Sequence, residues 1–150
     1  MPDDQPDCLF CRIVRGEIPA TRVYEDDAVL AFRDIAPRSP IHILVVPKKH
    51  IGSVADLTEA DGPLLGRLFG AIAQIARDEG IAEAGYRIVS NVGRWGGQTV
   101  DHLHFHLMGG RAFAWPPGSL ARRGSPTPAI GSSATSVAGA ARRSTISTST

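Results

Sequence analysis

The segment 99–108 alternates polar and apolar residues, and this pattern constrains the fold more than any other feature of the chain. Its histidines are His102, His104 and His106, and the residues between them are Leu103, Phe105 and Leu107. In an extended strand, successive side chains point to opposite faces, so the imidazoles share one face. Alternation of this kind usually marks a strand with one solvated face, but three neighbouring imidazoles would repel one another once protonated. We therefore predict a strand with an apolar core face and an imidazole face that meets a cleft or a metal.

Composition indicates one globular domain followed by a tail of a different kind. The chain has 150 residues and is 43% hydrophobic, which suffices for a single core. Residues 1–118 carry 12 Lys/Arg and 15 Asp/Glu, whereas residues 119–150 carry four Arg and no acid. The Ser/Thr-rich tail 119–150 is expected to be disordered and the leader 1–7 to be flexible, so the domain should span 8–118. The acidic balance of that domain argues against nucleic acid as a partner.

The positions of the two cysteines suggest a metal clip. They are Cys8 and Cys11, spaced C-x-x-C, in a chain with no apolar signal or membrane-spanning segment. We therefore expect a cytoplasmic protein without a membrane partner. In a reducing compartment such a pair is more typical of a metal site or a redox pair than of a structural disulfide. The alternative is two reduced thiols packed as small hydrophobic side chains.

Periodicity and turn residues predict an α+β fold. We expect a short helix over 8–15, strands over 22–25, 28–34, 41–46, 86–91 and 99–108, and one long helix that starts near 58–61 and ends at 77. The first two strands form a hairpin across Asp26-Asp27. The strand 41–46 is apolar almost throughout, so it should be central and buried on both faces. Gly80 should end the long helix, and Gly109-Gly110 the histidine strand.

All five histidines lie on or beside two of these strands. If the strands 41–46 and 99–108 pair, His42 and His50 join the other three. A lone His42 would more often be a core histidine, and its case improves only through these neighbours. Cys8 and Cys11 with two histidines would form a tetrahedral zinc site. His50 and His102 are the favoured partners, because each lies at the rim of its strand.

A glycine-rich loop precedes the histidines and suggests a phosphate ligand. Gly93, Gly96 and Gly97, followed by Gln98 and Thr99, can present backbone N–H groups and a hydroxyl to an anion, although a Gly-Gly turn alone is more often a hairpin connection. Imidazole can attack phosphorus while a second imidazole donates to an oxygen or to the leaving group. A nucleophilic serine is not indicated, because the sequence has no G-x-S-x-G motif.

These motifs resemble the histidine-triad (HIT) superfamily. The segment HLHFHLM at 102–108 matches its His-φ-His-φ-His-φ-φ motif. Further likeness to the Hint branch comes from AVLAFRDI at 28–35, PIHILVVPKKH at 40–50, GYRIVSN at 85–91, GGQTV at 96–100 and WPPG at 115–118. The resemblance covers residues 8–118 and is specific, since it rests on several spaced motifs. The tail after Gly118 has no counterpart in the family.

The resemblance implies a fold and an activity. Hint-like proteins are α+β homodimers, with an antiparallel sheet of about five strands per subunit, one long helix and a short N-terminal helix. Their sheets join across the two-fold axis. They hydrolyse the P–N bond of purine nucleoside 5′-phosphoramidates, such as AMP-amine or AMP-lysine conjugates, through a nucleotidyl-histidine intermediate.

The resemblance also implies roles for individual residues. His104 would be the nucleophile, His106 would contact the phosphate and assist the leaving group, and His42 would support them. Nucleotide contacts would come from Asn91, Gly97, Gln98 and Thr99 at the phosphate, Asp34 at the ribose, and Leu9, Phe10, Ile13, Phe32 and Ile35 at the purine. Trp115 would lie near the partner subunit's site. Members with a C-x-x-C resemble zinc-binding bacterial relatives, in which Cys8, Cys11, His50 and His102 would hold zinc.

Three other functions remain open. A dinucleoside polyphosphate hydrolase of a sister branch is disfavoured, because that branch usually has Gln where Met108 stands here and lacks the WPPG end. A nucleotide-binding regulatory or scaffold protein would keep the same residues. A zinc hydrolase would need an open coordination position, which a shell of two cysteines and two histidines fills.

Overall fold

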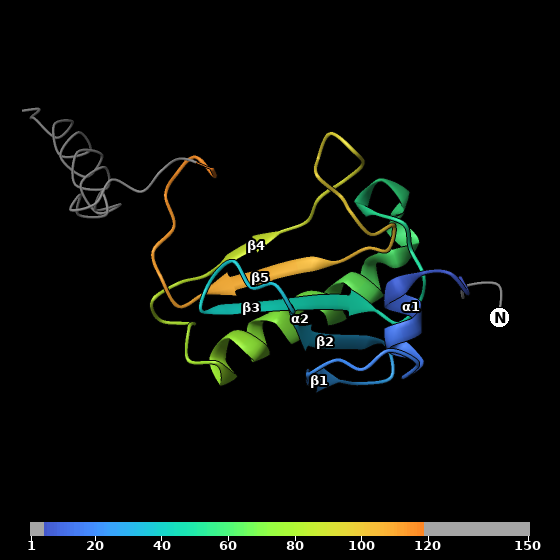
Figure 1. The fold of residues 1–150 in the computed structure, drawn as a ribbon, viewed down its shortest axis with the longest axis horizontal. Helices are drawn as coiled ribbons and strands as arrows, with labels where there is room; N and C mark the ends of the chain where they lie inside the picture. The colour runs from blue at the N-terminus through green and yellow to red at the C-terminus, as the bar shows by residue number, and fades with distance from the viewer. Residues whose placement is uncertain (1–4, 119–150) are drawn as a thin grey trace, which may run out of the picture. The chain divides into compact units, whose positions relative to one another are not determined.

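The structure is a computed structural model and describes residues 5–118. Its helices and strands, in chain order, are α1 (Leu9–Val14), β1 (Arg22–Glu25), β2 (Val29–Arg33), β3 (Ile41–Pro47), α2 (Gly62–Asp78), β4 (Arg87–Val89) and β5 (Phe105–Gly109), with short 3-10 turns at Val54–Asp56 and Glu59–Asp61. The strands form one antiparallel sheet in the order β1-β2-β3-β5-β4 (Figure 1). This arrangement confirms the predicted α+β fold of five strands, one long helix and a short N-terminal helix.

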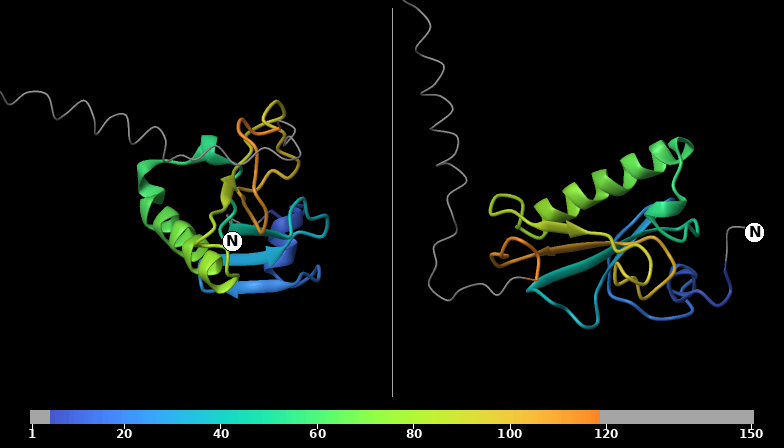
Figure 2. Two further views of the ribbon diagram at one scale, coloured as in Figure 1. Left: turned by 90° about the vertical axis from the view of Figure 1, so that its left-hand side faces the viewer. Right: turned by 90° about the horizontal axis from the view of Figure 1, so that it is seen from above.

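The sheet separates two hydrophobic clusters. The long helix α2 covers one face and α1 lies on the other (Figure 2). Under α2, the larger cluster contains Ile43 and Val45 of β3 together with Leu103, Phe105 and Leu107. On the opposite face, the smaller cluster contains Leu44 and Val46 of β3 with Phe10 and Ile13 of α1. β3 is therefore buried on both faces, as its continuous apolar sequence predicts.

Local residue chemistry accounts for the hairpin that leads into β3. The Asp26 Oδ1 atom accepts hydrogen bonds from the backbone N–H groups of Ala28 and Val29, each at 2.8 Å. These bonds close the turn between β1 and β2, as expected where Asp competes for turn amides. Arg67 of α2 forms ion pairs with Asp26 and Asp27. The turn is thereby tied to the long helix.

The histidine strand is shorter than predicted, and this part of the prediction was wrong. β5 begins at Phe105, so only His106 lies within it. Before it, the backbone N–H of His102 bonds to the Val100 carbonyl at 2.9 Å, and that of Leu103 bonds to the Ile51 carbonyl at 2.6 Å. β3 ends opposite this segment at Pro47, which has no N–H to donate. The alternation of faces nevertheless holds, because the three intervening apolar residues all enter the cluster under α2.

The described chain divides into two compact units. The first compact unit ends at Arg111, and residues 112–118 belong to a second unit, in which the peptide between Trp115 and Pro116 is cis. Most of the predicted leader and the whole predicted tail 119–150 lie outside the described residues, so the domain limits 8–118 stay a prediction. Among the described residues, no helix is long and apolar enough to cross a membrane.

Candidate active site and metal centre

Strand pairing brings the five histidines to one face of the sheet. β3 and β5 pair antiparallel, with Leu44 opposite His106 and His42 opposite Met108. This register makes His42 and His106 diagonal neighbours on the face opposite α2. His50 follows β3, and His102 and His104 precede β5. The histidines divide into two groups, one with the cysteines and one around His106.

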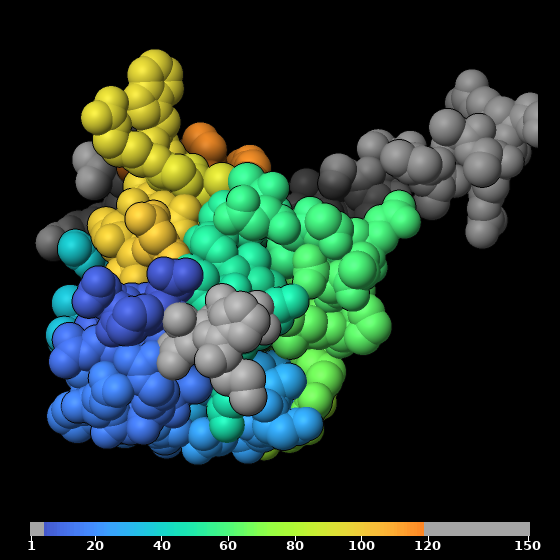
Figure 3. Space-filling model, turned by 90° about the vertical axis from the view of Figure 1, so that its right-hand side faces the viewer, coloured from blue at the N-terminus to red at the C-terminus, as the bar shows by residue number. Residues whose placement is uncertain are grey.

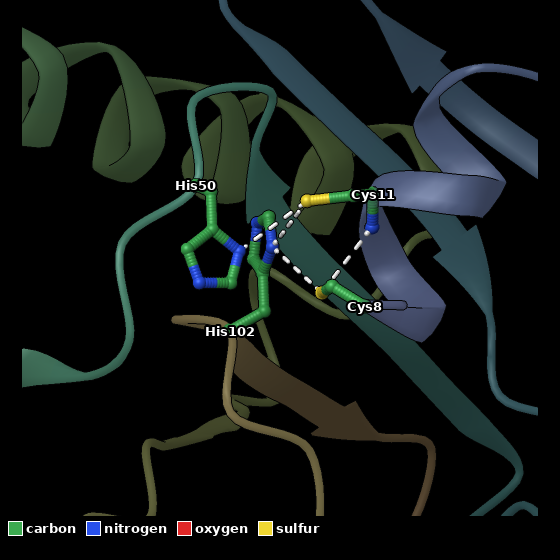
Figure 4. Close-up of side chains that lie close together, drawn as sticks. All are labelled: Cys8, Cys11, His50 and His102. Carbon is green, nitrogen blue, oxygen red and sulfur yellow. Dashed lines mark hydrogen bonds between the residues drawn. The ribbon is translucent and has the colours of Figure 1, made fainter. Parts of the chain in front are cut away.

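The first group consists of Cys8, Cys11, His50 and His102, and one potential ligand atom from each lies within 4.8 Å of the others. Cys11 comes from α1 and Cys8 is the N-cap of this helix, whereas His50 follows β3 and His102 precedes β5 (Figure 4). The Cys11 Sγ atom lies 3.3 Å from Nδ1 of His50 and 3.5 Å from Nδ1 of His102. Cys8 Sγ is also 3.5 Å from the latter atom.

These separations fit the edges of a tetrahedron around a zinc ion. With Zn–S bonds of about 2.3 Å and Zn–N bonds of about 2.0–2.1 Å, a tetrahedral site has S···N edges of about 3.5 Å. The three S···N distances here are 3.3–3.5 Å. Two sulfurs and two imidazole nitrogens are also one of the donor sets that are typical of structural zinc. The four side chains therefore lie close enough to hold a metal, and their chemistry is consistent with zinc.

Backbone groups prepare these side chains for a cation. The Nε2 atom of His102 lies 2.8 Å from the Pro47 carbonyl oxygen, which can only accept, so Nε2 carries the proton and Nδ1 faces the sulfurs with its lone pair. His102 is fully buried, and burial lowers its pKa to about 4, which keeps the ring uncharged at neutral pH. The Cys11 backbone N–H donates to Cys8 Sγ at 3.5 Å, which helps to hold that sulfur in place.

The second group is centred on a hydrogen bond between two imidazoles. Nε2 of His42 lies 2.9 Å from Nδ1 of His106. The backbone N–H of Arg38 donates to Nδ1 of His42 at 3.0 Å, so a neutral His42 carries its proton on Nε2 and donates it to His106. His106 must then carry its own proton on Nε2. Burial lowers the pKa of both rings, that of His106 to about 4 with help from its His104 and His42 neighbours.

This bonding pattern is unsuited to a second metal, although a carboxylate lies nearby. One ligand atom each of Asp34, His42 and His106 lies within 4.8 Å of the others. A metal on Nε2 of His42 would need the lone pair of that atom. Because Nδ1 of the same ring already accepts from Arg38, the ring would have to become an anion. The group thus favours proton chemistry over metal binding.

His104 lies between the two groups with one nitrogen fixed. Its Nδ1 atom is 2.7 Å from the His102 carbonyl oxygen, so Nδ1 carries the proton and, in the neutral ring, Nε2 keeps a lone pair. The ring is 4% exposed. It packs edge-on against Phe10 and His106, each at a centroid distance of 5.0 Å. This arrangement can present an imidazole nucleophile beside a hydrogen-bond donor.

Two of the residues predicted to bind phosphate, Asn91 and Gln98, form hydrogen bonds within and beside the glycine-rich loop. The Gln98 amide nitrogen donates to the carbonyls of Gly52 and Val100, and its oxygen accepts from the Gly93 N–H. The Asn91 amide donates to the Gly96 carbonyl at 2.6 Å. Gly97 takes a positive φ of 81°, a conformation that glycine adopts without strain. The loop stands out from the body of the protein in Figure 3.

Close to this loop, the surface is hollowed. The hollow has a volume of about 320 Å³ and is lined by Asp7, Cys8, Leu9, Thr99, Val100 and Asp101. The Thr99 side chain is exposed, unlike that of Gln98. Asn91 and Gln98 are half-buried, so among these three residues Thr99 is the most exposed.

The structure brings together three of the five predicted purine contacts. Phe10, Ile13 and Phe32 belong to the cluster under α1 and are each at most 6% exposed. Leu9 and Ile35 are 44% and 99% exposed and lie outside this cluster. Trp115, in the second unit, is 83% exposed. The nucleotide contacts assigned to these side chains stay predictions.

Sequence reasoning missed the backbone groups that orient the rings. The Arg38 N–H, the Pro47 carbonyl and the His102 carbonyl each fix one imidazole, and Ser90 Oγ bonds to the His104 carbonyl at 2.9 Å. No residue pattern could reveal these partners, because nearly every residue has a carbonyl and an N–H.

Imidazoles held in this way on one sheet face define a histidine-triad protein. Residues 15–113 match the HIT domain family, and the chain belongs to this family. An uncharacterised HIT-like protein of Synechococcus elongatus is 55% identical over 75% of this chain and 97% of its own length. The purine nucleoside phosphoramidase of Escherichia coli K12 is 50% identical over 69% of this chain and 87% of its own length. The crystal structure of a HIT family hydrolase from Legionella pneumophila superposes with a TM-score of 0.74 at 52% identity, over 75% of this chain and all of that one. This membership and likeness place the present chain among the HIT family hydrolases.

Proposed function

We propose that the chain hydrolyses the P–N bond of purine nucleoside 5′-phosphoramidates through a nucleotidyl intermediate on His104. The observation that carries this proposal is the bond of 2.7 Å between Nδ1 of His104 and the His102 carbonyl. It leaves the Nε2 lone pair as the nucleophile, and the same carbonyl would stabilise the imidazolium that forms on attack. The 50% identity to a purine nucleoside phosphoramidase supports the choice of substrate class.

The first step transfers the nucleotidyl group to the protein. Nε2 of His104 attacks the α-phosphorus, a P–N bond forms to the imidazole, and the P–N bond to the substrate amine breaks. The electron pair of the broken bond stays on the amine nitrogen, which takes a proton from solvent. In the second step, water attacks phosphorus, its proton returns to solvent, and the nucleoside monophosphate leaves His104. The sum consumes one water molecule.

His106 acts in this scheme as a hydrogen-bond donor to the phosphate. His42 and His106 share one proton between their facing nitrogens, and the Arg38 N–H occupies the remaining nitrogen of His42. The pair holds two protons, one on Nε2 of each ring. If His106 gave its Nε2 proton away, one proton would remain for two rings, and one ring would become an imidazolate. Nε2–H is therefore retained and directed at a non-bridging oxygen, where negative charge builds up on attack. It aids the leaving group by this means.

We propose that Thr99 and the backbone of Gly97 contact the phosphate, while Asn91 and Gln98 hold the loop in shape. The internal bonds of the two amides support this division. The purine would be bound at the surface next to Phe10, Ile13 and Phe32, with Leu9 and Ile35 at its edge and Trp115 supplied to a partner subunit. The ribose would contact Asp34.

We propose that Cys8, Cys11, His50 and His102 hold a structural zinc ion. The ion would close a four-ligand shell and so serve the fold rather than the reaction. It would tie α1 to the segment before β5, and thereby fix the His102 carbonyl that orients His104. The S···N distances of 3.3–3.5 Å support this assignment.

We also propose a homodimer with joined sheets. β4 is an edge strand of the sheet, and its Ile88, together with Tyr86 and Val92 beside it, is between 36% and 39% exposed. Apolar side chains on an open strand edge favour pairing with another chain. Light scattering of the purified protein at several concentrations would give the mass, and a monomer throughout would contradict this proposal.

The intermediate provides the direct test of the chemistry. The protein is mixed with an adenosine 5′-phosphoramidate, quenched with base within a second, digested and analysed by mass spectrometry. We expect an AMP-sized mass increase on the peptide that contains His104, and none in a His104→Asn variant. Turnover without any covalent adduct, or an adduct on His106 or His42, would refute the assignment of the nucleophile.

A further inference from the structure

Residues 34–41 contact both the backbone and the ring of His42. The position of the Asp34 carboxylate in this segment is not explained by ribose binding alone. The Asp34 backbone N–H donates to the His42 carbonyl at 3.0 Å, and the Arg38 N–H donates to the ring. One carboxylate oxygen of Asp34 accepts from the Ala36 N–H at 2.8 Å. The other oxygen lies 3.5 Å from Nε2 of His42. The carboxylate is thus held by the backbone with one oxygen aimed at the ring.

We propose that Asp34 is a positioning residue that keeps the proton of His42 on Nε2 and thereby keeps the proton of His106 on the nitrogen that meets the phosphate. This inference rests on the proposed function and gives the candidate ribose contact a second task. A carboxylate beside an N–H stabilises the proton there, and a carboxylate that fixes a catalytic imidazole in one tautomer is a known device of hydrolases.

Burial makes such a carboxylate effective. The side chains of His42 and Asp34 are 3% and 18% exposed, respectively, so their interaction is weakly screened by water. The charged and titratable groups around the two rings are Asp34, Arg38 and His104. Among them only Asp34 is acidic and raises the pKa of both rings, against the lowering by burial and by its cationic or imidazole neighbours.

The substitution Asp34→Asn separates the two tasks because of how the side chain is held. The amide oxygen of Asn can still accept from the Ala36 N–H, which leaves an NH₂ group facing Nε2 of His42. Two donors then oppose each other at that point. The proton of His42 is then expected to move to Nδ1 of the same ring, with loss of the hydrogen bond from the Arg38 N–H. The proton of His106 moves to its own Nδ1, which faces the lone pair on Nε2 of His42, and no longer meets the phosphate.

The test combines a tautomer measurement with two substrates. Nitrogen-15 NMR of histidine-labelled, ligand-free protein reports which nitrogen of His106 is protonated. Activity is measured with an adenosine phosphoramidate and with its 2′,3′-dideoxy analogue, which lacks the hydroxyls for a ribose contact. Asp78→Asn, an exposed carboxylate at the end of α2, is the matched control and should leave every readout unchanged.

We expect Asp34→Asn to exchange the two ring-nitrogen signals of His106 and to lower kcat at least about 10-fold with both substrates, a modest share of what positioned imidazoles contribute. Unchanged His106 signals, with a KM that rises only for the ribose substrate, would overturn the inference. If the wild-type protein turned over neither substrate, the proposed function would fail, and the NMR signals alone would decide the role of Asp34. Thermal unfolding of the variant checks that it is folded.

Discussion

The two histidine groups lie on the same face of one sheet, yet their nitrogens are used in opposite ways. Each contains a pair of imidazoles at a centroid distance near 5 Å, His50 with His102 at 5.0 Å and His42 with His106 at 5.2 Å. In the cysteine group, the nitrogen lone pairs converge on two sulfurs. In the His106 group, one ring donates to the other. The first arrangement suits a cation and the second a phosphate.

The difference comes from the backbone rather than from residue type. The Pro47 carbonyl accepts a hydrogen bond from the protonated Nε2 of His102, which leaves the lone pair of Nδ1 available to a metal. The Arg38 N–H donates a hydrogen bond to Nδ1 of His42, so the proton of the neutral ring lies on Nε2 and makes that nitrogen a donor. One acceptor or one donor opposite a ring thus decides which chemistry an imidazole can perform.

His102 connects the two groups. Its ring belongs to the cysteine group, and its carbonyl accepts a hydrogen bond from Nδ1 of His104 at 2.7 Å. Phe10 packs edge-on against both rings, at centroid distances of 5.9 Å from His102 and 5.0 Å from His104. Structural support from the proposed zinc would therefore reach the proposed nucleophile through one residue.

The strongest test of the comparison is His104→Asn set against His50→Asn. Loss of the nucleophile should lower kcat/KM for an adenosine phosphoramidate at least about 1,000-fold, which corresponds to about 4 kcal/mol of activation free energy. The folded state and the zinc content should persist, since His104 is outside the cysteine group. Steady-state kinetics and elemental analysis give both quantities.

His50→Asn is the matched control for that variant. It should lose zinc, and its kcat/KM should fall far less than that of His104→Asn at temperatures where it stays folded, because the Pro47 carbonyl still holds the His102 ring. The two variants would then separate the groups in both directions. Substantial turnover by His104→Asn, or loss of zinc from it, would show that the groups do not divide the work in this way.

Removal of the metal should have the next largest effect, and on stability. Cys11→Ser breaks the proposed four-ligand shell, and metal that binds only the folded state contributes directly to folding. We expect the free energy of unfolding to fall by about 3 kcal/mol, and the unfolding temperature with it. Urea titration of the zinc-loaded wild type and the variant measures this change.

A chelator supplies the control for the metal experiment. It should lower the stability of the wild type and leave Cys11→Ser unchanged, because the variant has no site to empty. Equal stability of wild type with and without chelator, together with no zinc in the purified protein, would contradict the metal assignment and favour two reduced thiols.

Much of this arrangement follows from sequence pattern alone. The alternation at 102–107 predicts two faces, and the structure places Leu103, Phe105 and Leu107 in the cluster under α2. The apolar run at 41–46 predicts a central strand, and β3 lies at the centre of the sheet. The rim positions of His50 and His102 predict their approach to the cysteines. These features depend on periodicity and spacing, which a sequence displays directly.

Other features depend on contacts between distant segments and could not be predicted. The start of β5 at Phe105 reflects bonds from 102–103 to Val100 and Ile51. The internal use of the Asn91 and Gln98 amides reflects the path of the loop. The exposure of Ile35 likewise follows from the turn at 34–36, where Asp34 bonds to Ala36.

The smallest expected effect is a loss of stability at low pH that arises in the His106 group and not in the cysteine group. Burial lowers the pKa of His106 to about 4 in the folded protein, whereas an unfolded histidine titrates near its ordinary value of about 6.5. Between these values the unfolded state binds more protons, so the free energy of unfolding falls as pH drops from about 6.5 toward 4 and is constant above that range for this group. One pKa unit corresponds to about 1.4 kcal/mol. Since His106 is only partly buried, we expect about 1 kcal/mol of loss at pH 5.

Urea titrations of wild type and His106→Asn at pH 7 and pH 5 measure this contribution. Both proteins keep the cysteine group, so any acid-induced metal loss affects them alike, and the difference between their pH dependences belongs to His106 and its hydrogen bond with His42. We expect the variant to lose about 1 kcal/mol less stability than the wild type over this interval. An equal loss in both proteins would mean that His106 takes up its proton as readily when folded as when unfolded. In that case the ring could be cationic near neutral pH, the single shared proton of the His42–His106 pair would no longer hold, and His106 would regain the capacity to protonate the leaving amine.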